Sequence, residues 1–237
     1  MAKMKFEDLI LWEDDNYIII NKPAFISTLA DRSDDKNILS MARQYHQDAQ
    51  VCHRLDKETT GALAIAKNPE AYRHLSMQFE GRQVTKIYHA VVDGIHDFNN
   101  LRVEAAIQKL STGTVKLDKL KGKEAVTIFN TQKAFKAHSL VECQPVTGRM
   151  HQIRIHLASR EAPITGDEAY GGKPVFLSQL KRNYNLKKFT EEQPLIQRLA
   201  LHAFSLQFNL PDDKTVRVEA PYPKDFRVLV TQLEKNS

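Results

Sequence analysis

Hydrophobic and polar positions along the chain predict strands from two kinds of pattern. One strand is predicted over residues 12–23, where the short apolar run at 17–20 ends at Asn21-Lys22-Pro23, and another over the apolar run at 61–66, which follows a turn. Alternating apolar and polar side chains mark residues 84–94, which place Lys86 and Tyr88 on one face of a strand. Further short strands, with turns typical of an antiparallel meander, are predicted at 103–106, 113–117, 124–130 and 137–144, and a hairpin at 199–210 and 215–220.

Four segments have apolar residues at helical spacing. The residues at this spacing are Ile38, Ala42 and Tyr45; Ala71, Leu75 and Phe79; Met150, Ile153 and Leu157; and Phe226, Leu229, Val230 and Leu233. Asp34-Asp35 is the predicted cap of the first helix, Asn68 and Gly81 bound the second, and the third is expected to begin at Gly148. These elements predict the α+β class, with a mixed, mainly antiparallel sheet and flanking helices.

Composition places few limits on function. The 237 residues are 42% apolar and 27% charged, with a net charge of +5, which is ordinary for a globular protein and compatible with RNA as partner. No apolar run approaches the roughly 20 residues that span a membrane. Cys52 and Cys143 form no disulfide framework, so a reducing, cytoplasmic setting is expected. We expect one domain over 1–237, a basic surface insertion at 176–198, and a monomer.

The densest cluster of ionisable side chains lies just before the strand predicted at 61–66. Five ionisable side chains occupy six positions, with Leu55 as the one interruption: His53, Arg54, Asp56, Lys57 and Glu58. A turn is expected at 59–61. A polar loop fixed to a core strand is a frequent place for catalytic residues, but a solvated ion-pair turn gives the same pattern. A kinase catalytic loop is excluded, because Leu55 separates Arg54 from Asp56.

Histidines raise the question of a metal site. On the predicted third helix, His151 and Arg154 share a face, whereas His151 and His156 diverge, and no cysteine pair accompanies them. His53 and His202 lie elsewhere in the chain. We therefore predict structural histidines and no metal.

Four motifs in order resemble one known family. They are His53-Arg54-Leu55-Asp56 followed by Thr59-Thr60-Gly61; Lys86-Ile87-Tyr88-His89-Ala90; the segment from Thr147 to Leu157; and Leu201-His202-Ala203. This set resembles the RluA family of pseudouridine synthases, with Thr60 in place of the usual Ser. The chain departs from the family after Pro23, where a Gly-containing loop is usual and Ala24 to Leu29 stand here. No S4-like RNA-binding segment is recognised before Trp12, so RNA contacts are expected from the catalytic domain itself.

The resemblance implies a pseudouridine synthase-like catalytic domain with a central cleft, and an enzyme that isomerises uridine in RNA without a cofactor. It assigns the catalytic carboxylate to Asp56, its basic partner to Arg154 and an active-site tyrosine to Tyr88. Arg54 is expected to occupy the place that the target uridine leaves. The further RNA-binding residues that we predict are His53, Lys86, Arg149 and His151, and the target is ribosomal or transfer RNA.

Two other functions share some of these features. An RNA-binding or folding-assisting protein would have the same charge and fold, but it has no need of the carboxylate of Asp56. A retaining glycoside hydrolase would need a second carboxylate, and the motifs offer Glu58 alone. A steep salt dependence of RNA binding is expected of a pseudouridine synthase and of an RNA-binding protein, but not of a glycoside hydrolase.

Overall fold

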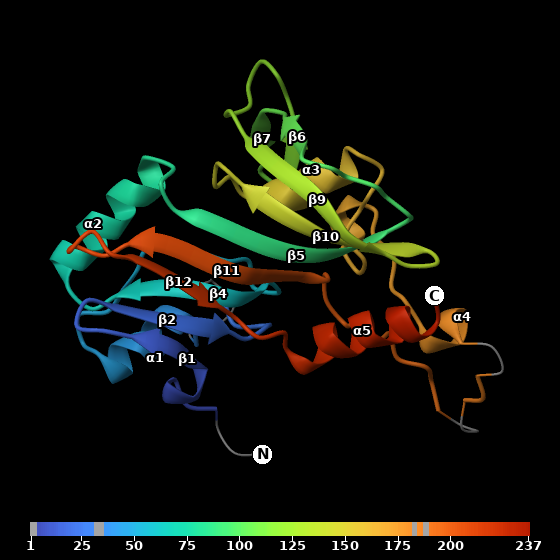
Figure 1. The fold of residues 1–237 in the computed structure, drawn as a ribbon, viewed down its shortest axis with the longest axis horizontal. Coiled ribbons are helices and arrows are strands. Elements are labelled where there is room, and N and C mark those ends of the chain that lie inside the picture. The colour runs from blue at the N-terminus through green and yellow to red at the C-terminus, as the bar shows by residue number, and fades with distance from the viewer. Residues whose placement is uncertain (1–3, 31–35, 182–183, 187–189) are drawn as a thin grey trace. The chain divides into compact units, whose positions relative to one another are not determined.

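The computed structural model describes residues 4–30, 36–181, 184–186 and 190–237. These described residues form short helices and strands that follow each other closely along the chain (Figure 1). The strands are β1 (Ile10–Glu13), β2 (Tyr17–Lys22), β3 (Gln50–Val51), β4 (Thr60–Ala66), β5 (Thr85–Asp93), β6 (Leu101–Glu104), β7 (Ile107–Lys109), β8 (Val115–Leu117), β9 (Val126–Ala134), β10 (His138–Pro145), β11 (Leu201–Asn209) and β12 (Thr215–Glu219). The helices are α1 (Ile38–Tyr45), α2 (Pro69–Glu80), α3 (Gln152–Ala158), α4 (Leu177–Leu180) and α5 (Lys224–Lys235), with 3-10 turns η1 (Glu7–Leu9) and η2 (Glu168–Tyr170).

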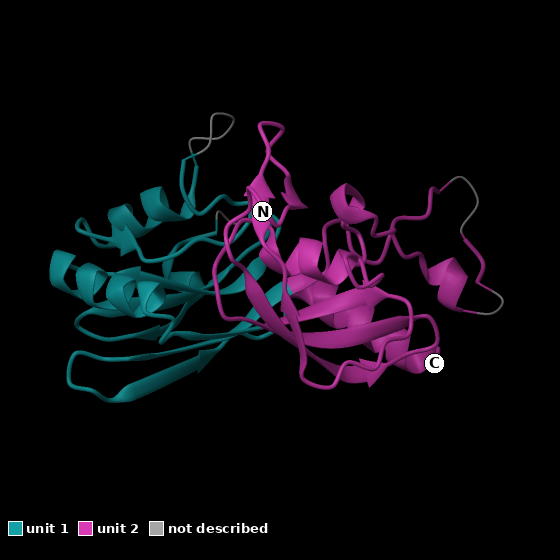
Figure 2. Ribbon diagram, turned by 90° about the horizontal axis from the view of Figure 1, so that it is seen from above, with its two compact units in different colours: residues 1–87, 202–222 teal, residues 88–201, 223–237 magenta. Residues whose placement is uncertain are grey.

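The chain divides into two compact units (Figure 2). Unit 1 consists of Met1–Ile87 and His202–Tyr222, and unit 2 of Tyr88–Leu201 and Pro223–Ser237. The chain passes between the units at three places: within β5, within β11 after Leu201, and between Tyr222 and Pro223.

Unit 1 is organised around β4, in which every residue is buried. The strand order is β1-β2-β4-β11, with β3 paired to β4 and β12 to β11. Neighbours are antiparallel except β4 and β11, which run parallel at Thr60 and His202. Side chains alternate across a strand, so Ala62, Ala64 and Ala66 share one face, and they belong to one apolar cluster with Ala71 and Leu75 of α2.

The helices of unit 1 follow local signals in the sequence. α2 begins after Asn68, whose side chain accepts a hydrogen bond from Ala71 N–H, and Gly81 ends it, which confirms the prediction. α1 is also confirmed. Its expected cap, Asp34-Asp35, lies outside the described residues, and its N-cap is Asn37, which forms a reciprocal capping box with Ser40.

The predicted single strand at 12–23 is wrong, because the segment contains a hairpin. β1 ends at Glu13 and β2 starts at Tyr17, and the two strands pair antiparallel. The carboxylate of Asp14 accepts hydrogen bonds from the N–H groups of Asn16 and Tyr17 at 2.8 and 2.6 Å. A short polar side chain that satisfies the backbone in this way makes a turn, and the polar residues 13–16 therefore separate Trp12 from the apolar run at 17–20.

Unit 2 contains the sheet β5-β10-β9-β6 and the separate hairpin β7-β8. The predicted antiparallel pairing is confirmed, and β9 and β10 pair as consecutive strands. The full meander is wrong, because β6 pairs with β9 across the separate β7-β8 hairpin, and β10 also pairs with the distant β5. The pairing of β5 with β10, which are far apart in sequence, leaves no local signal in either strand. α3 packs against β8, β9 and β10.

The C-terminal hairpin and helix are as predicted. β11 pairs with β12, and α5 buries Phe226, Leu229 and Leu233. At the start of α5, Asp225 receives two hydrogen bonds from the buried guanidinium of Arg198, at 2.8 and 3.1 Å. Of the segment 176–198, where a basic insertion is predicted, part lies outside the described residues, and α4 is its one described helix.

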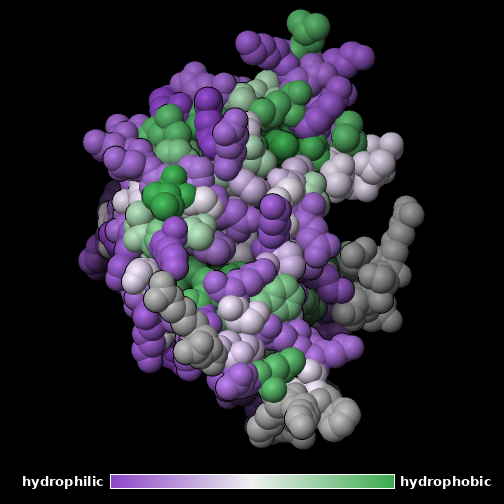
Figure 3. Space-filling view, turned by 90° about the vertical axis from the view of Figure 1, so that its right-hand side faces the viewer, coloured by the Kyte–Doolittle hydropathy of each residue, from purple (hydrophilic) through white to green (hydrophobic). Residues whose placement is uncertain are grey.

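Among the described residues, no helix is long and apolar enough to cross a membrane. On the face drawn in Figure 3, polar side chains cover most of the surface and hydrophobic side chains form small separate groups.

Candidate active site

The loop that carries Asp56 is fixed through the backbone of its neighbours. Leu55 is 6% exposed, and the hydroxyl of Thr28 both accepts from Leu55 N–H at 3.1 Å and donates to Leu55 C=O at 2.9 Å. Thr59 N–H donates to Asp56 C=O at 3.1 Å, which places the turn at 57–58. The predicted turn at 59–61 is therefore wrong, because Thr60 already belongs to β4. The partly exposed side chain of Asp56 thus sits on an anchored loop.

A buried ammonium group provides the second anchor. Lys22 is fully buried, and its Nζ donates to the carbonyls of Pro23, Ile26 and Lys57 at 2.9, 2.8 and 3.1 Å. Phe25 N–H donates to the same Lys57 carbonyl at 2.8 Å. Charge-assisted hydrogen bonds of this kind are stronger than neutral ones, so Lys22 joins the 23–28 loop firmly to the residue that follows Asp56.

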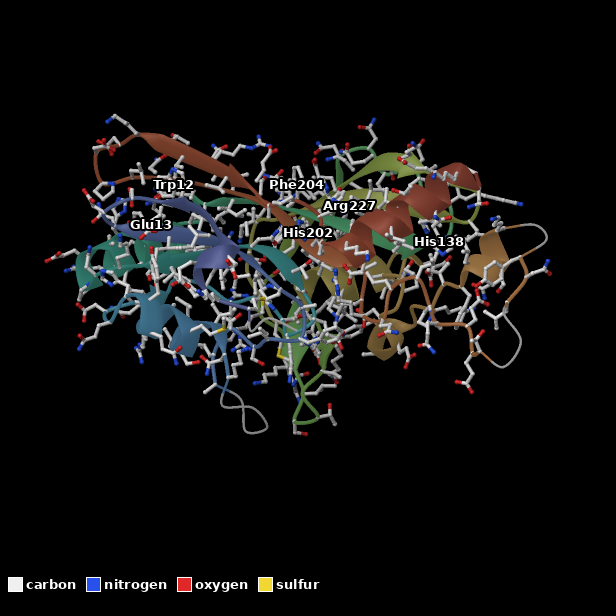
Figure 4. All side chains as sticks on the ribbon, turned by 90° about the horizontal axis from the view of Figure 1, so that it is seen from below. Trp12, Glu13, His138, His202, Phe204 and Arg227 are labelled. Carbon is white, nitrogen blue, oxygen red and sulfur yellow. The ribbon has the colours of Figure 1, made fainter. Side chains whose placement is uncertain are left out.

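The strand behind this loop requires glycine at position 61. Gly61 has φ +114°, and a Cβ there would lie 2.1 Å from the carbonyl oxygen of Ala203. β4 and β11 can therefore approach closely at the start of β4. Next to it, Thr60 Oγ lies 2.8 Å from His202 Nδ1, and His202 Nε2 lies 3.0 Å from Ala220 C=O. Figure 4 labels His202 among the side chains of the ribbon. Since a carbonyl only accepts, Nε2 of His202 carries the proton and Nδ1 accepts from Thr60.

His53 and Lys86 belong to the same unit as Asp56. His53 Nε2 accepts from Ala64 N–H at 3.0 Å, so its proton is on Nδ1, and its ring lies 4.8 Å from that of Phe79. Burial, with a smaller contribution from the charge of Lys86, lowers the pKa of His53 to about 3. Burial also lowers the pKa of Lys86 to about 8. His53 is therefore neutral at pH 7, while Lys86 remains mostly protonated.

The neutral state of His53 predicts a loss of stability in acid. Its pKa is lower in the folded chain than the ordinary 6.5, so protonation favours the unfolded chain below pH 6.5, and the loss stops near pH 3. We expect the His53 contribution to cost about 2 kcal/mol between pH 7 and pH 5. Urea unfolding at both pH values measures it. His53→Gln, which keeps an acceptor for Ala64 N–H, should lose less stability over this interval; equal losses in both proteins would contradict the prediction.

In unit 2, the start of α3 differs from the prediction. The helix begins at Gln152 and not at Gly148, because His151 has φ +50°, the left-handed conformation, and acts as N-cap. The buried amide of Gln152 explains this start. Its oxygen accepts from the Thr147 hydroxyl and from Arg149 N–H, and its nitrogen donates to Val126 C=O and the Thr127 hydroxyl. His151 and Arg154 therefore do not share a helical face.

Arg154 forms a buried ion pair with Asp167, and both Arg154 and His151 contact Tyr170. Arg154 Nε and Nη2 donate to the two carboxylate oxygens of Asp167 at 2.6 and 2.7 Å, and Asp167 is 2% exposed. The guanidinium carbon lies 4.9 Å from the centroid of the Tyr170 ring, a cation–π arrangement. The Tyr170 hydroxyl accepts from Val115 N–H at 3.1 Å and lies 2.8 Å from His151 Nδ1.

Asp167 and Tyr170 were not among the residues predicted for the site. Both lie in the Gly-rich segment 163–172, which the sequence marks as a tight loop but not as a partner of α3. Gly166 has φ +79°, and a Cβ there would lie 2.5 Å from Arg198 C=O. The signal in the sequence that could have indicated a site here is an acidic and an aromatic residue beside three glycines.

The other predicted residues have simpler surroundings. Arg54 and Arg149 are exposed, and Arg149 Nε donates to Glu124 C=O at 3.0 Å. Tyr88 is partly buried on β5, opposite Cys143 of β10. By unit, His53, Arg54, Asp56 and Lys86 belong to unit 1, and Tyr88, Arg149, His151 and Arg154 to unit 2.

Buried histidines serve hydrogen bonds of the fold. His156 Nδ1 lies 2.9 Å from the Thr127 hydroxyl and its Nε2 3.0 Å from Ala105 C=O, the same arrangement as at His202. Within the described parts of the chain, no group of three His, Cys, Asp or Glu side chains is placed to hold a metal ion.

Comparison with known proteins gives one consistent result. The family described as RNA pseudouridylate synthase matches residues 16–159. The ribosomal large subunit pseudouridine synthase C of Buchnera aphidicola subsp. Baizongia pistaciae is 34% identical, with 96% of this chain and 71% of the relative aligned. The ribosomal large subunit pseudouridine synthase D of Neisseria meningitidis serogroup A is also 34% identical, over 94% of this chain and 60% of the relative.

A solved structure agrees with the sequence matches. The human protein RNA Pseudouridylate Synthase Domain Containing 4 has a TM-score of 0.73 at 26% identity, and the alignment covers 97% of this chain and 94% of that one. The family match covers the loop of Asp56, the strand of Tyr88 and the helix of Arg154. The chain therefore belongs to the RNA pseudouridylate synthase family and is of the RluA type.

Proposed function

We propose that this protein converts specific uridines of ribosomal RNA to pseudouridine, with Asp56 as the catalytic carboxylate. Family membership supports the reaction, and relatives named for the large ribosomal subunit, at 34% identity, support the substrate. Because this chain spans 71% and 60% of those relatives, the RNA target is part of the proposal. Transfer RNA is a second target class, which the same assay distinguishes.

The reaction fits the types of residue present. The bond between the sugar C1′ and N1 of uracil breaks, the base turns, and C1′ bonds to C5, which loses its proton while N1 gains one. Atoms and electrons balance within the nucleotide, so the proposed reaction needs no cofactor and no metal. It does need a carboxylate that attacks, or stabilises positive charge on, the reacting nucleotide, and we assign this role to Asp56.

The proposed roles of Arg154 and Tyr88 follow from charge and position. A carboxylate in a dry pocket needs a cation to remain ionised, and we assign that cation to Arg154. Its pair with Asp167 uses Nε and Nη2, which orients the planar guanidinium and keeps it rigid. Tyr88 is proposed to lie against the target base, where its hydroxyl can transfer a proton.

RNA contacts are proposed for five further residues. Arg54 would take the place of the flipped uridine, and exposed Arg149 would contact phosphate, as would Lys86. His53 and His151, each with a ring nitrogen in a hydrogen bond of the fold, complete the proposed set of RNA contacts. We further propose one catalytic domain over 1–237, a monomer, and a cytoplasmic location.

Lys86 gives this proposal a pH dependence. With a pKa near 8, the fraction of Lys86 that is charged falls as pH rises from 7 to 8.5, and phosphate affinity should fall with it. We expect a decrease of up to about fourfold over this interval. Binding measured at constant ionic strength tests this. Lys86→Arg keeps its charge and should show a flat profile; equal pH profiles in both proteins would refute the contact.

The direct test of function uses purified protein and ribosomal RNA from cells that lack this gene. We expect new pseudouridine at defined positions. We also expect the logarithm of the RNA association constant to fall linearly with the logarithm of the salt concentration. Salt-dependent binding without any pseudouridine would instead indicate a binding protein. Sugar release without a salt dependence would indicate a hydrolase.

A further inference from the structure

The loop at 23–28 contains an aromatic residue in an unfavourable conformation. Phe25 has φ +64°, in the left-handed region that glycine adopts readily and that few other residues adopt. Its side chain is 52% exposed, so burial of the ring contributes little to compensate for this conformation. A glycine would suit the backbone better, and this loop is where the chain departs from the Gly-containing pattern of its family. The fold of the loop does not require a phenylalanine.

The surrounding contacts hold Phe25 in this conformation and join it to Lys57, the residue that follows Asp56. Its N–H donates to Lys57 C=O at 2.8 Å, and the ammonium of Lys22 binds the carbonyls on both sides of it, those of Pro23 and Ile26. All of these residues belong to unit 1. Backbone strain that persists because neighbouring bonds impose it is typical of functional sites.

The chemistry around Phe25 suits a nucleic-acid base. Two exposed cations, Arg54 and Lys57, flank Asp56 in the loop to which Phe25 is bonded. Single-stranded nucleic acid is held by this combination, in which cations contact the backbone and an exposed aromatic ring stacks on a base. Uridine in RNA must leave its helical stack to react, so a neighbouring base also loses a stacking partner.

We infer that Phe25 is a stacking platform for an RNA base next to the target uridine, and so a residue that determines substrate binding in this protein. The inference rests on the proposed function. It assigns Phe25 to binding and not to chemistry. Loss of the ring should therefore raise KM and leave kcat largely unchanged.

The test compares Phe25→Gly, Phe25→Trp and the control Tyr72→Ala on ribosomal RNA from cells lacking the gene. Tyr72 is an exposed aromatic residue of α2 in the same unit. We expect Phe25→Gly to raise KM by about five- to 150-fold, the range of base–aromatic stacking, with a Tm equal to or above that of the wild type. Phe25→Trp should keep the wild-type KM, and its added tryptophan fluorescence should change when oligouridylate binds. Tyr72→Ala should have no effect on KM.

Two outcomes overturn the inference. An unchanged KM in Phe25→Gly shows that no base stacks on the ring. A raised KM together with a lowered Tm shows that Phe25 acts by packing within the loop. Failure of the proposed function is recognised separately, because the wild-type protein would then form no pseudouridine with the same RNA.

Discussion

Replacing Asp56 by Asn should reduce pseudouridine formation by at least about a thousandfold while the protein remains folded. The amide has nearly the same shape but lacks the negative charge and nucleophilicity that the proposed reaction requires. The loop keeps its anchors in this variant, because they are the backbone groups of Leu55 and Lys57, the Thr28 hydroxyl and the Lys22 ammonium. Pseudouridine measured by nucleoside analysis, together with a thermal unfolding curve, tests both parts.

The matched control is Glu58→Gln, which removes a carboxylate two residues away in the same loop. It should retain most of the activity, because the proposed reaction uses one carboxylate. If Glu58→Gln were as inactive as Asp56→Asn, a mechanism with two carboxylates would be favoured. Normal turnover in Asp56→Asn would remove Asp56 from the catalytic role.

Replacing Asp167 by Ala should lower the free energy of unfolding by about 3–5 kcal/mol. Arg154 is 9% exposed and Asp167 2% exposed, so the substitution leaves a guanidinium buried with its main anionic partner removed. The Tyr170 ring compensates only in part, since a cation–π contact contributes about 0.5–2 kcal/mol. Urea unfolding at pH 7 measures the change.

The control for this prediction is the double variant Arg154→Met with Asp167→Leu. It removes both charges and should recover part of the lost stability, because replacing a buried ion pair by apolar side chains is often neutral or stabilising. A loss below about 1 kcal/mol in Asp167→Ala would mean that the pair is effectively solvated, contrary to its burial.

The sequence predicted those elements whose signals are local. Asn68, Pro69 and Gly81 marked both ends of α2, and the apolar spacing of Phe226, Leu229 and Leu233 marked α5. The pairing of β5 with β10 was not predicted, because some fifty residues separate the strands and neither carries a signal for the other. His151 was placed in a helix because the periodicity of its neighbours does not reveal the hydrogen bonds of the Gln152 amide.

The same contrast between local signals and long-range contacts holds for the candidate site. The motif around Asp56 was recognised from adjacent residues, as was the strand of Tyr88. The anchors of the Asp56 loop, Lys22 and Thr28, come from a segment about thirty residues earlier. Asp167 became a partner of Arg154 only through the fold of a glycine-rich loop. The motifs therefore identify the residues that we propose to react, whereas the contacts that hold these residues in place depend on tertiary structure.

The most direct test of the central claim is a transcriptome-wide map of pseudouridine in cells with and without this gene. If Asp56 is the catalytic carboxylate, at least one pseudouridine of ribosomal RNA disappears without the gene, returns with the wild-type protein, and does not return with Asp56→Asn. Identical maps of ribosomal and transfer RNA in both strains, with the wild-type protein expressed, would contradict it.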